Sequence, residues 1–291
     1  MFSNTYILKI GSFAIKLFCK TNREISFDSG YIPFITSENI SNPSTEIEII
    51  ESIPEDLRNE DKLIFESNDE TKKLWHICKL DDGYKVIVFN PLLPNKIQQI
   101  AIIPASSYQW KIYCELNENN LLMPFSYPMG PIILYYLTTV NNAIMIHSSG
   151  IIDGKKGRLF SGFSGAGKST MAEIWKENGH PIINDDRLLL AIEDEKVIMH
   201  NTPMFYEDNP KSNQLQAIYL LKQTQENCIR QLNNAEAISR LLAFCIQHSY
   251  DKQFLEHHLT TIFDIYNLIP IYELGFKPDT DIIDFIRSHE L

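Results

Sequence analysis

The sequence has few cysteines, no cluster of basic residues and no low-complexity tract, and each absence excludes a class of protein. Its five cysteines in 291 residues are far apart, so none forms the closely spaced pair of a zinc site or a redox motif. The 26 basic and 37 acidic residues give a formal net charge of −11, which repels nucleic-acid phosphates and anionic lipid surfaces. We therefore expect a cytoplasmic protein with reduced thiols and with neither nucleic acid nor membrane as a partner.

Long hydrophobic runs are also missing. The most membrane-like stretch, PFSYPMGPIILYYLTTVNNAIMIH, is broken by Pro128, Pro131 and residues 141–142 into pieces too short to span a bilayer. It is more typical of a buried helix followed by a buried strand. The first residues, MFSNTYILKIGSFAIKLF, contain no basic leader ahead of a continuous apolar block, so we expect no signal peptide.

Residues 5 to about 115 have the pattern of short strands joined by turns. Two apolar pieces flank Gly11, and the segment STEIEIIES alternates as a half-buried strand does. Asp82 and Gly83 separate two apolar-aromatic runs in the manner of a hairpin turn. We predict an antiparallel, β-rich N-terminal domain over residues 1–120, which is a normal size for a domain.

From residue 121 onward strands alternate with helices, which favours an α/β layer. Helices are predicted at 129–140 and 168–178, the second ending at Gly179, and three more in the C-terminal third. Strands are predicted at AIMIHSSGIID, RLFSGF, PIIN, LQAIYLLKQ and IPIYELGF, and LLLAIEDEKVIMHN is typical of a hairpin that turns at 194–195. The predicted fold class is therefore α/β (α+β mixed), with a second domain over residues 121–291.

One motif in the second domain carries chemistry. It fits G-x-x-x-x-G-K-[ST] at each fixed position, and its residues are Gly162, Phe163, Ser164, Gly165, Ala166, Gly167, Lys168 and Ser169. Glycines permit backbone angles that let successive N–H groups face phosphate oxygens, and the helix that follows presents its positive end to them. Lys168 supplies a cation for the β- and γ-phosphates, and Ser169 supplies a hydroxyl for Mg²⁺. Because an apolar strand precedes the motif and an amphipathic helix follows it, we expect ATP and Mg²⁺ to bind over residues 162–170, with Thr170 as helix support and not as a metal ligand.

Two adjacent aspartates follow the predicted strand PIIN. The carboxyl ends of strands in open α/β sheets are where ligand sites form, and a phosphate-binding loop needs a further carboxylate for its metal. Asp185 and Asp186 are the candidates, because LQAIYLLKQ ends without an acid and Asp264 lies inside a predicted helix. One of the two could hold Mg²⁺ while the other accepts a proton from an attacking hydroxyl.

These segments resemble a known family. The sequence IHSSGIID…GRLFSGFSGAGKST…NGHPIINDDRLLL is similar to the catalytic core of HPr kinase/phosphorylase and its kinase-like relatives, which are related in fold to phosphoenolpyruvate carboxykinase. The resemblance covers about residues 130–245 and is specific between 144 and 190. It implies a P-loop kinase domain of this type, general-base and magnesium roles for the aspartate pair, and a place for His147 near the transferred phosphate. Arg187 completes an Asp-Asp-Arg pattern and could bridge the carboxylates, touch phosphate or form a structural ion pair.

The resemblance extends to shorter relatives encoded beside peptide-modifying systems, including kinases of lasso-peptide tails, through HNTPMF, LQAIYLLKQ and LNNAEAISRLL. It departs from HPr kinase/phosphorylase proper in two places. No E-I-R-G-x-G segment follows the aspartates, where Glu207 is only a positional candidate, and the N-terminal half does not match the usual regulatory domain. The resemblance therefore implies neither HPr as the acceptor nor reversal by phosphorolysis.

The sequence thus predicts an ATP-dependent phosphotransferase whose acceptor is a serine of a peptide or small protein. The predicted catalytic residues are Asp185, Asp186, His147 and Lys168, and the predicted metal ligands are Ser169, Asp185 and Asp186. A small-molecule acceptor, a non-catalytic ATP-binding module that recruits a partner protein, and a homo-oligomer remain open. A decarboxylating, carboxykinase-like enzyme would need further cationic residues and a metal-binding histidine–lysine set, which the sequence does not offer.

Smaller signals in the sequence need no function. His257 and His258 lie inside a predicted helix without a ligand partner nearby, and we expect them at its surface. Residues 155–156 are lysines of a predicted turn. The aromatic residues of the N-terminal half are more typical of a β-core than of a stacking platform for bases.

Overall fold

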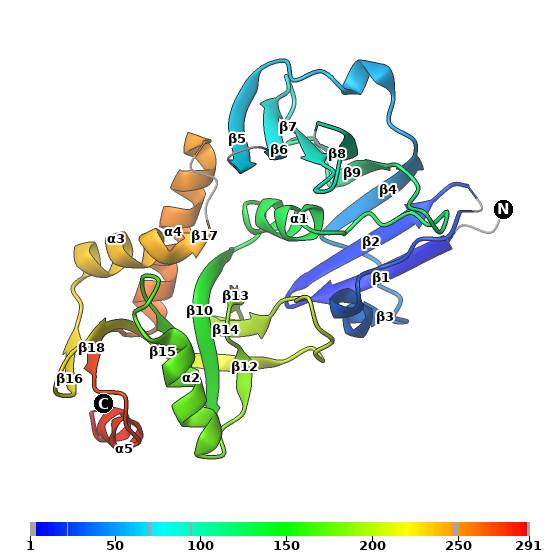
Figure 1. Cartoon of the computed structure of the whole chain (residues 1–291). Helices are drawn as coiled ribbons and strands as arrows, with labels where there is room; N and C mark the ends of the chain where they lie inside the picture. The colour runs from blue at the N-terminus through cyan, green and yellow to red at the C-terminus, as the bar shows by residue number, and fades with distance from the viewer. Residues whose placement is uncertain (1–3, 22, 70–71, 94, 247–249, 290–291) are drawn as a thin grey trace. The chain divides into compact units, whose positions relative to one another are not determined.

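The structure is a computed structural model, and it describes residues 4–21, 23–69, 72–93, 95–246 and 250–289 (Figure 1). It is a mixed α/β protein with two large mixed sheets. The chain divides into two compact units: unit 1 is Met1–Leu137 with Pro203–Asn209, and unit 2 is Thr138–Thr202 with Pro210–Leu291. The sequence predicts two separately folding domains with a boundary between residues 120 and 121. A division into compact units does not test separate folding, so this boundary stays a prediction. Within the described ranges, no helix has both the length and the apolar character that crossing a membrane requires.

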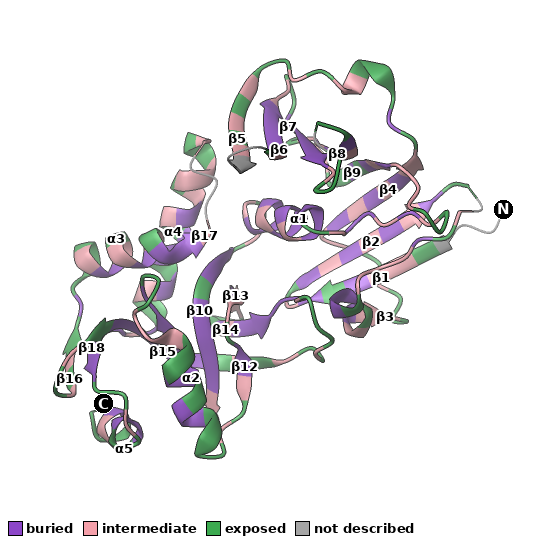
Figure 2. Ribbon diagram, in the orientation of Figure 1, coloured by how far each residue is buried: buried purple, intermediate pink, exposed green. Residues whose placement is uncertain are grey.

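Unit 1 is built on a nine-stranded sheet, in the order β3-β1-β2-β4-β9-β8-β7-β6-β5. The strands are β1 Asn4–Ile10, β2 Phe13–Cys19, β3 Ile35–Thr36, β4 Thr45–Glu51, β5 Leu63–Asp69, β6 Lys72–Lys79, β7 Tyr84–Phe89, β8 Ile97–Ile103 and β9 Gln109–Cys114. Two short 3₁₀ helices, η1 Ser29–Phe34 and η2 Glu55–Leu57, lie in the connections, and helix α1 Met129–Thr138 follows the sheet. β7 is buried along its whole length, as Figure 2 shows, and it is hydrogen-bonded to a strand on each side, β6 and β8.

The hairpins that the sequence predicts in unit 1 are present, but the sheet is not antiparallel throughout. Gly11 (φ +58°) turns between β1 and β2. Gly83 (φ +89°) turns between β6 and β7, where a Cβ would lie 2.0 Å from the carbonyl oxygen of Ile103. β2 and β9 both run parallel to β4, so the prediction of an antiparallel domain is wrong in this part. Alternating apolar residues identify a strand but not its neighbour, and the long connection through η1 and β3 allows the crossover that a parallel pair needs.

Unit 2 contains strands that close a ring. The strands of unit 2, inside and outside the ring, are β10 Ala143–Asp153, β11 Lys156–Ser161, β12 Ile182–Asn184, β13 Arg187–Glu193, β14 Lys196–Asn201, β15 Ser212–Gln223, β16 Cys228–Gln231, β17 Cys245–Ile246 and β18 Ile271–Phe276. The ring runs β11-β10-β13-β14-β15 and returns to β11 through a parallel pair. β18 and then β16 extend the sheet beyond β15. Each of the long strands β10 and β15 pairs with both of its neighbours in the ring; β10 also pairs with β12 and β17, and β15 also pairs with β18.

Helices cover both sides of this sheet. They are α2 Lys168–Glu177, α3 Asn234–Phe244, α4 Lys252–Leu268 and α5 Asp281–Ser288. One apolar cluster includes Leu241 of α3 and Ile262 of α4, and the other includes Trp175 of α2 and Ile286 of α5. The predicted helix at 168–178 is confirmed, with Gly179 (φ +83°) following its end. β16 and β17 were too short to leave a pattern that predicts a strand.

The histidines of α4 correct one expectation. His258 is fully buried, and its Nε2 lies 3.2 Å from the hydroxyl of Thr138. His257 Nε2–H donates to the carbonyl oxygens of Thr138 (3.1 Å) and Asn141 (2.9 Å). Burial, with a contribution from His257, lowers the pKa of His258 to about 4, so the imidazole is neutral at pH 7. The predicted surface position is therefore wrong for the buried His258, and both rings tie α4 to the segment ahead of β10.

A seven-residue segment of unit 1, Pro203–Asn209, lies between β14 and β15 in the chain. Its contacts within unit 1 are close. The ring of Phe205 lies 5.5 Å from that of Tyr127, measured between centroids. The backbone of Met204 passes so near Gly30 that a Cβ on Gly30 would lie 1.8 Å from the Met204 oxygen. The segment is therefore held by unit 1 although the strands on either side of it belong to unit 2.

The two ends of this segment are joined by hydrogen bonds between Asn201 and Lys211, which both belong to unit 2. The N–H of Asn201 donates to the carbonyl oxygen of Lys211 at 3.1 Å. The N–H of Lys211 donates to Oδ1 of Asn201 at 2.7 Å. The chain thus leaves and re-enters unit 2 at neighbouring points, and the pairing of β14 with β15 is preserved.

Candidate active site

The predicted phosphate loop connects β11 to α2, so the strand–loop–helix order that the motif requires is present (Figure 1). Gly165 and Gly167 have φ angles of +79° and +102°, in the left-handed region that favours glycine. Gly167 immediately precedes the first helical residue, Lys168. A Cβ on Gly167 would lie 2.5 Å from Cζ of Phe276, a buried ring of β18. The path of the loop is therefore set by glycine at two positions.

Backbone N–H groups of the loop suit phosphate oxygens. Ala166 N–H donates to the carbonyl oxygen of Phe163 at 3.0 Å, and Met171 N–H donates to that of Gly167 at 2.9 Å. Apart from Ala166, the residues from 164 to 170 have backbone N–H groups with no protein acceptor in the described part of the chain. Free N–H groups at the start of a helix, next to the positive end of its dipole, are the donors that bind phosphate in proteins. The loop fits a nucleotide on this ground.

The polar side chains of the loop add positive charge and hydroxyls. Lys168 Nζ donates to the carbonyl oxygens of Gly162 (2.9 Å) and Phe163 (3.2 Å), so the ammonium lies against the first residues of the loop. Ser169 and Thr170 are exposed in the first turn of α2. A cation, a helix start and an exposed hydroxyl are thus close along the chain, which is the donor set expected for a phosphate with a bound Mg²⁺.

The predicted aspartates follow the end of β12. Asp185 and Asp186 lie in the connection between β12 and β13. Oδ1 of the buried Asn184 accepts hydrogen bonds from the N–H groups of Asp186 (2.9 Å) and Arg187 (3.4 Å). An asparagine side chain that accepts from the backbone two and three residues further on fixes a tight turn. This turn separates the two carboxylates and gives them different neighbours.

The two carboxylates differ in their freedom. Asp186 Oδ1 lies 3.2 Å from Nδ1 of His147, and its Oδ2 accepts a hydrogen bond from Nε of Arg187 at 3.0 Å. Asp185 is exposed, and its Oδ1 accepts a hydrogen bond from the hydroxyl of the buried Ser149. Among the described residues, none pairs with the other oxygen of Asp185. Asp185 therefore has an oxygen available for a proton or a cation, whereas Asp186 is oriented by two neighbours.

Strand β10 connects the loop with the aspartates. On one side Ser148 pairs with Ser161, the last residue of β11, and the Ser161 hydroxyl donates to the carbonyl oxygen of His147 at 2.7 Å. On the other side His147 pairs with Arg187, and the carbonyl oxygen of Asp186 accepts from Ser148 N–H (3.1 Å) and His147 Nδ1 (2.8 Å). Neighbouring strands are about 4.8 Å apart, so the backbones of Ser161 and Arg187 lie roughly 10 Å apart across β10. The start of the loop and the aspartates thus share one support.

The predicted site residues fall into two groups. His147 contacts Asp186 directly, and its side chain is 58% exposed although its neighbours on β10 are buried. A histidine exposed in this way faces the site and not the core. Residues 162–170 form the second group, and the hydrogen bonds of Lys168 go to loop carbonyls, not to the aspartates. The two groups are joined through the backbone of β10.

Sequence reasoning missed supporting residues at this site, namely Ser149, Asn184, Gln223 and Phe244. Gln223 Nε2 donates to the carbonyl oxygen of Gly165 at 2.7 Å, and the ring of Phe244 lies 4.9 Å from that of Phe163. Strand alternation could have indicated Ser149, which is two residues after His147 and shares its face. An asparagine directly before the acids is a turn signal. The other two residues are distant in sequence and leave no local signal.

The C-terminal end of β10 is held by a cluster of ion pairs. Asp153 accepts hydrogen bonds from Arg158 and Arg287, each at 2.6 Å, and Arg158 also donates to the hydroxyl of Tyr219 at 3.1 Å. Burial opposes ionisation of Asp153, but the two arginines outweigh it and lower the pKa of Asp153 to about 2. Burial raises the pKa of Tyr219 to about 12. These side chains fix the C-terminal end of β10, beyond His147.

Comparisons with known proteins add little to this geometry. No protein-family model and no curated protein matches the chain. Among solved structures, the chain is similar to the Hpr(Ser) kinase/phosphatase from Coxiella burnetii, with a TM-score of 0.32 and 13% sequence identity. That likeness covers 50% of this chain and 95% of the other. A likeness this distant carries no argument, so the candidate active site stands on its own residues.

Proposed function

We propose that the chain is an ATP-dependent phosphotransferase that moves the γ-phosphoryl group of Mg-ATP to a hydroxyl, with a serine of a peptide or small protein as the acceptor. The observation that carries the proposal is the arrangement around β10. A glycine-shaped loop with free N–H groups starts on one side of this strand, and an exposed aspartate with a free oxygen lies on the other. The peptide acceptor is supported by the sequence resemblance to relatives encoded beside peptide-modifying systems.

The loop residues would bind and orient the nucleotide. The free N–H groups of residues 164–170 would donate to phosphate oxygens, and the Lys168 ammonium would turn from its loop carbonyls to the β- and γ-phosphates. Ser169 and Asp186 are the residues that would hold Mg²⁺, with His147 fixing the orientation of Asp186. The metal, when bound, would neutralise charge that develops on the transferred phosphoryl group.

Asp185 is the residue assigned to the acceptor. Its free carboxylate oxygen would accept the proton of the serine hydroxyl as the hydroxyl oxygen forms its bond to phosphorus and the bond from phosphorus to the ADP oxygen breaks. The hydrogen bond from Ser149 holds the carboxylate in place during this step. Proton transfer by a positioned side chain contributes about 10²–10⁴-fold to a rate.

The substitution Asp185→Asn tests this assignment. Purified protein is incubated with γ-labelled ATP and candidate serine-containing peptides, and phosphopeptides are quantified by mass spectrometry. The variant should lose transfer by about 10²–10⁴-fold while its ATP affinity changes by less than about threefold. Asp194→Asn is the matched control, because Asp194 lies in the β13–β14 turn with a positive φ that asparagine tolerates.

Two outcomes would contradict the proposal. Transfer that persists in Asp185→Asn at the rate of the control would remove the aspartate from its role. ATP binding by the unsubstituted protein without phosphorylation of any peptide or small hydroxyl compound would favour the non-catalytic module that recruits a partner.

A further inference from the structure

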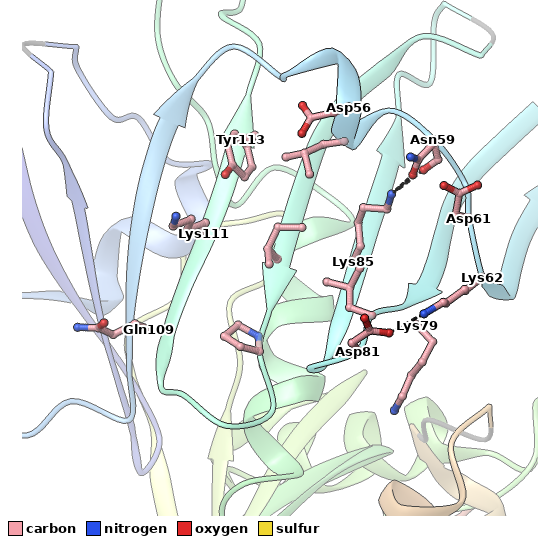
Figure 3. Close-up of a pocket in the computed structure, with 14 residues that line it drawn as sticks. Asp56, Asn59, Asp61, Lys62, Lys79, Asp81, Lys85, Gln109, Lys111 and Tyr113 are labelled. Carbon is pink, nitrogen blue, oxygen red and sulfur yellow. Dashed lines mark hydrogen bonds and ion pairs between the residues drawn. The ribbon is translucent and has the colours of Figure 1, made fainter.

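Unit 1 contains a hollow of about 530 Å³ that the predicted site residues do not share, since all of those belong to unit 2 (Figure 3). It is lined by residues of strands β6 to β9 and of the turns beside them, and by residues of η2 and of the connection from η2 to β5. Leu57, Leu80, Ile102 and Pro104 supply apolar surface to the lining. Lysines, aspartates and a tyrosine supply the rest, so the hollow combines an apolar surface with charged groups.

Lys85 is the group that distinguishes this hollow from an ordinary surface depression. It is only 4% exposed, and its ammonium donates to the carbonyl oxygen (2.7 Å) and to Oδ1 (2.6 Å) of Asn59, as Figure 3 shows for this pair. Within the described residues, no carboxylate lies at ion-pair distance from this ammonium. A buried cation whose partners are all neutral is costly in free energy, and a bound anion would offset that cost.

A second cation, Lys111, lies two strands away from Lys85 in the same sheet. Lys85 pairs with Ile102 of β8, and Ile102 pairs with Lys111 of β9. Neighbouring strands are about 4.8 Å apart, so the two lysine backbones are separated by roughly 10 Å with an isoleucine between them. Lys111 is exposed, and it has no hydrogen-bond or ion-pair partner in the described part of the chain. Figure 3 shows Lys111 with Tyr113 on one side of the hollow and Lys85 with Asn59 on the other.

The remaining charges of the lining decide which anions fit. Four lysines and three aspartates give the lining a formal charge of +1, against −11 for the whole chain. Asp81 is paired with Lys62 at 2.6 Å. Asp56 and Asp61 add negative charge that repels a polyphosphate or a nucleic acid. A ligand with two separated carboxylates on an apolar body matches the lining better than a dense polyanion does.

We propose that this hollow binds a ligand that carries two carboxylates on either side of an apolar stretch. One carboxylate binds Lys85, the other binds Lys111, and the apolar part lies over Ile102. An acidic segment of a peptide and a free dicarboxylic acid both supply this chemistry. The site and its test do not involve phosphotransfer, so the proposal stands apart from the function proposed above.

The test titrates the full chain with two probes, octanedioate and the blocked peptide Ac-Glu-Val-Val-Glu-NH₂, by calorimetry and by amide chemical shifts. The glutamine version of the peptide is the ligand control. Lys85→Met and Lys111→Met should each weaken binding by about fivefold or more, because each removes one charge-assisted contact. Lys96→Met is the protein control: Lys96 is an exposed lysine of unit 1 outside the hollow, and its loss should change binding by less than about twofold.

The outcomes distinguish an acidic peptide from a free dicarboxylic acid as the ligand, and both from the absence of a binding site. Binding of the peptide alone assigns the hollow to an acidic peptide segment, and binding of octanedioate alone assigns it to a free acid; both support the shared chemistry. Absence of saturable binding by either probe, shifts that map away from residues 56–62 and β6 to β9, or equal binding by Lys111→Met and Lys96→Met would overturn it. If Lys85→Met fails to fold by circular dichroism, the exposed Lys111→Met carries the test.

Discussion

The phosphate loop and the aspartate turn lie on opposite sides of β10, and they are held in different ways. The loop depends on backbone conformation: Gly165 and Gly167 adopt positive φ, and Gly167 leaves no room for a Cβ beside Phe276. The aspartate turn depends on side chains: Asn184 accepts from the backbone, and Ser149 donates to a carboxylate. A site whose shape depends on glycine backbone angles is determined by residues that are contiguous in the sequence. A site whose shape depends on side-chain hydrogen bonds also needs residues from distant parts of the sequence, which only the fold brings together.

This difference has a consequence for mutation. A substitution in the loop should act through strain in the backbone and should affect nucleotide affinity. A substitution around the aspartates should remove one hydrogen bond, leave nucleotide affinity intact and affect the transfer step. Of the three predictions below, the first and the third test whether the two regions respond in these separate ways, and the second tests the ion-pair cluster that holds the end of β10.

The largest effect of these three is expected from Gly167→Ala. Its Cβ meets the ring of Phe276 at 2.5 Å and its φ of +102° is unfavourable for alanine. We expect ATP to bind about 100-fold more weakly, close to 2.7 kcal/mol, by calorimetry. Gly165→Ala is the matched control, because its φ is +79° but its Cβ would meet nothing within 4 Å, so strain alone should weaken ATP binding about tenfold. Wild-type affinity in Gly167→Ala would show that ATP does not bind at this loop.

The next effect is a loss of folding stability at low pH, caused by the ion pairs of Asp153 at the C-terminal end of β10. The pKa of Asp153 is about 2 in the folded chain and 3.8 ordinarily, because Arg287 and Arg158 outweigh the effect of burial. A lowered pKa stabilises the fold above about pH 4, and this contribution of about 2 kcal/mol is lost as the pH falls toward 2. Urea unfolding at a series of pH values measures it. In Asp153→Asn the slope between pH 4 and pH 2 should be shallower, and an unchanged slope would contradict the assignment.

The smallest effect is expected from Ser149→Ala. Loss of the hydroxyl removes the hydrogen bond to Asp185, and we expect kcat for transfer to fall about tenfold while KM for ATP stays within about twofold. Ser148→Ala is the matched control, because Ser148 is equally buried and its hydroxyl donates to the carbonyl oxygen of Ile146 at 3.3 Å, not to an aspartate. Equal losses in both variants, or a large rise in KM for ATP, would erase the distinction between the loop and the turn.

Local elements of the fold could be predicted from the sequence, but their partners could not. Gly11, Gly83 and the turn at 194–195 marked hairpins correctly, since a turn is decided by neighbouring residues. The ring closes through β11 and β15, whose pairing joins Leu159 to Ile218, and no pattern within either strand specifies that neighbour. Parallel pairing of β2 with β4 was missed for the same reason.

The candidate site follows the same rule. The loop residues were predictable because the motif states the backbone geometry that phosphate requires. The environments of the aspartates were not, since the difference between Asp185 and Asp186 depends on Ser149 and on the ring of His147, which approach from β10. His258 was misplaced because burial of a histidine depends on a hydrogen-bond partner such as Thr138, far away in the sequence.

The segment Pro203–Asn209 makes this protein hard to dissect. The chain passes between the units after Leu137, after Thr202 and after Asn209, so a single cut cannot release either half. Removal of residues 1–137 would leave Met204 and Phe205 without Gly30 and Tyr127, the residues that they contact. Because Asn201 and Lys211 are hydrogen-bonded to each other at the two ends of this segment, a short synthetic turn from residue 202 to residue 210 is the rational way to isolate unit 2 for study.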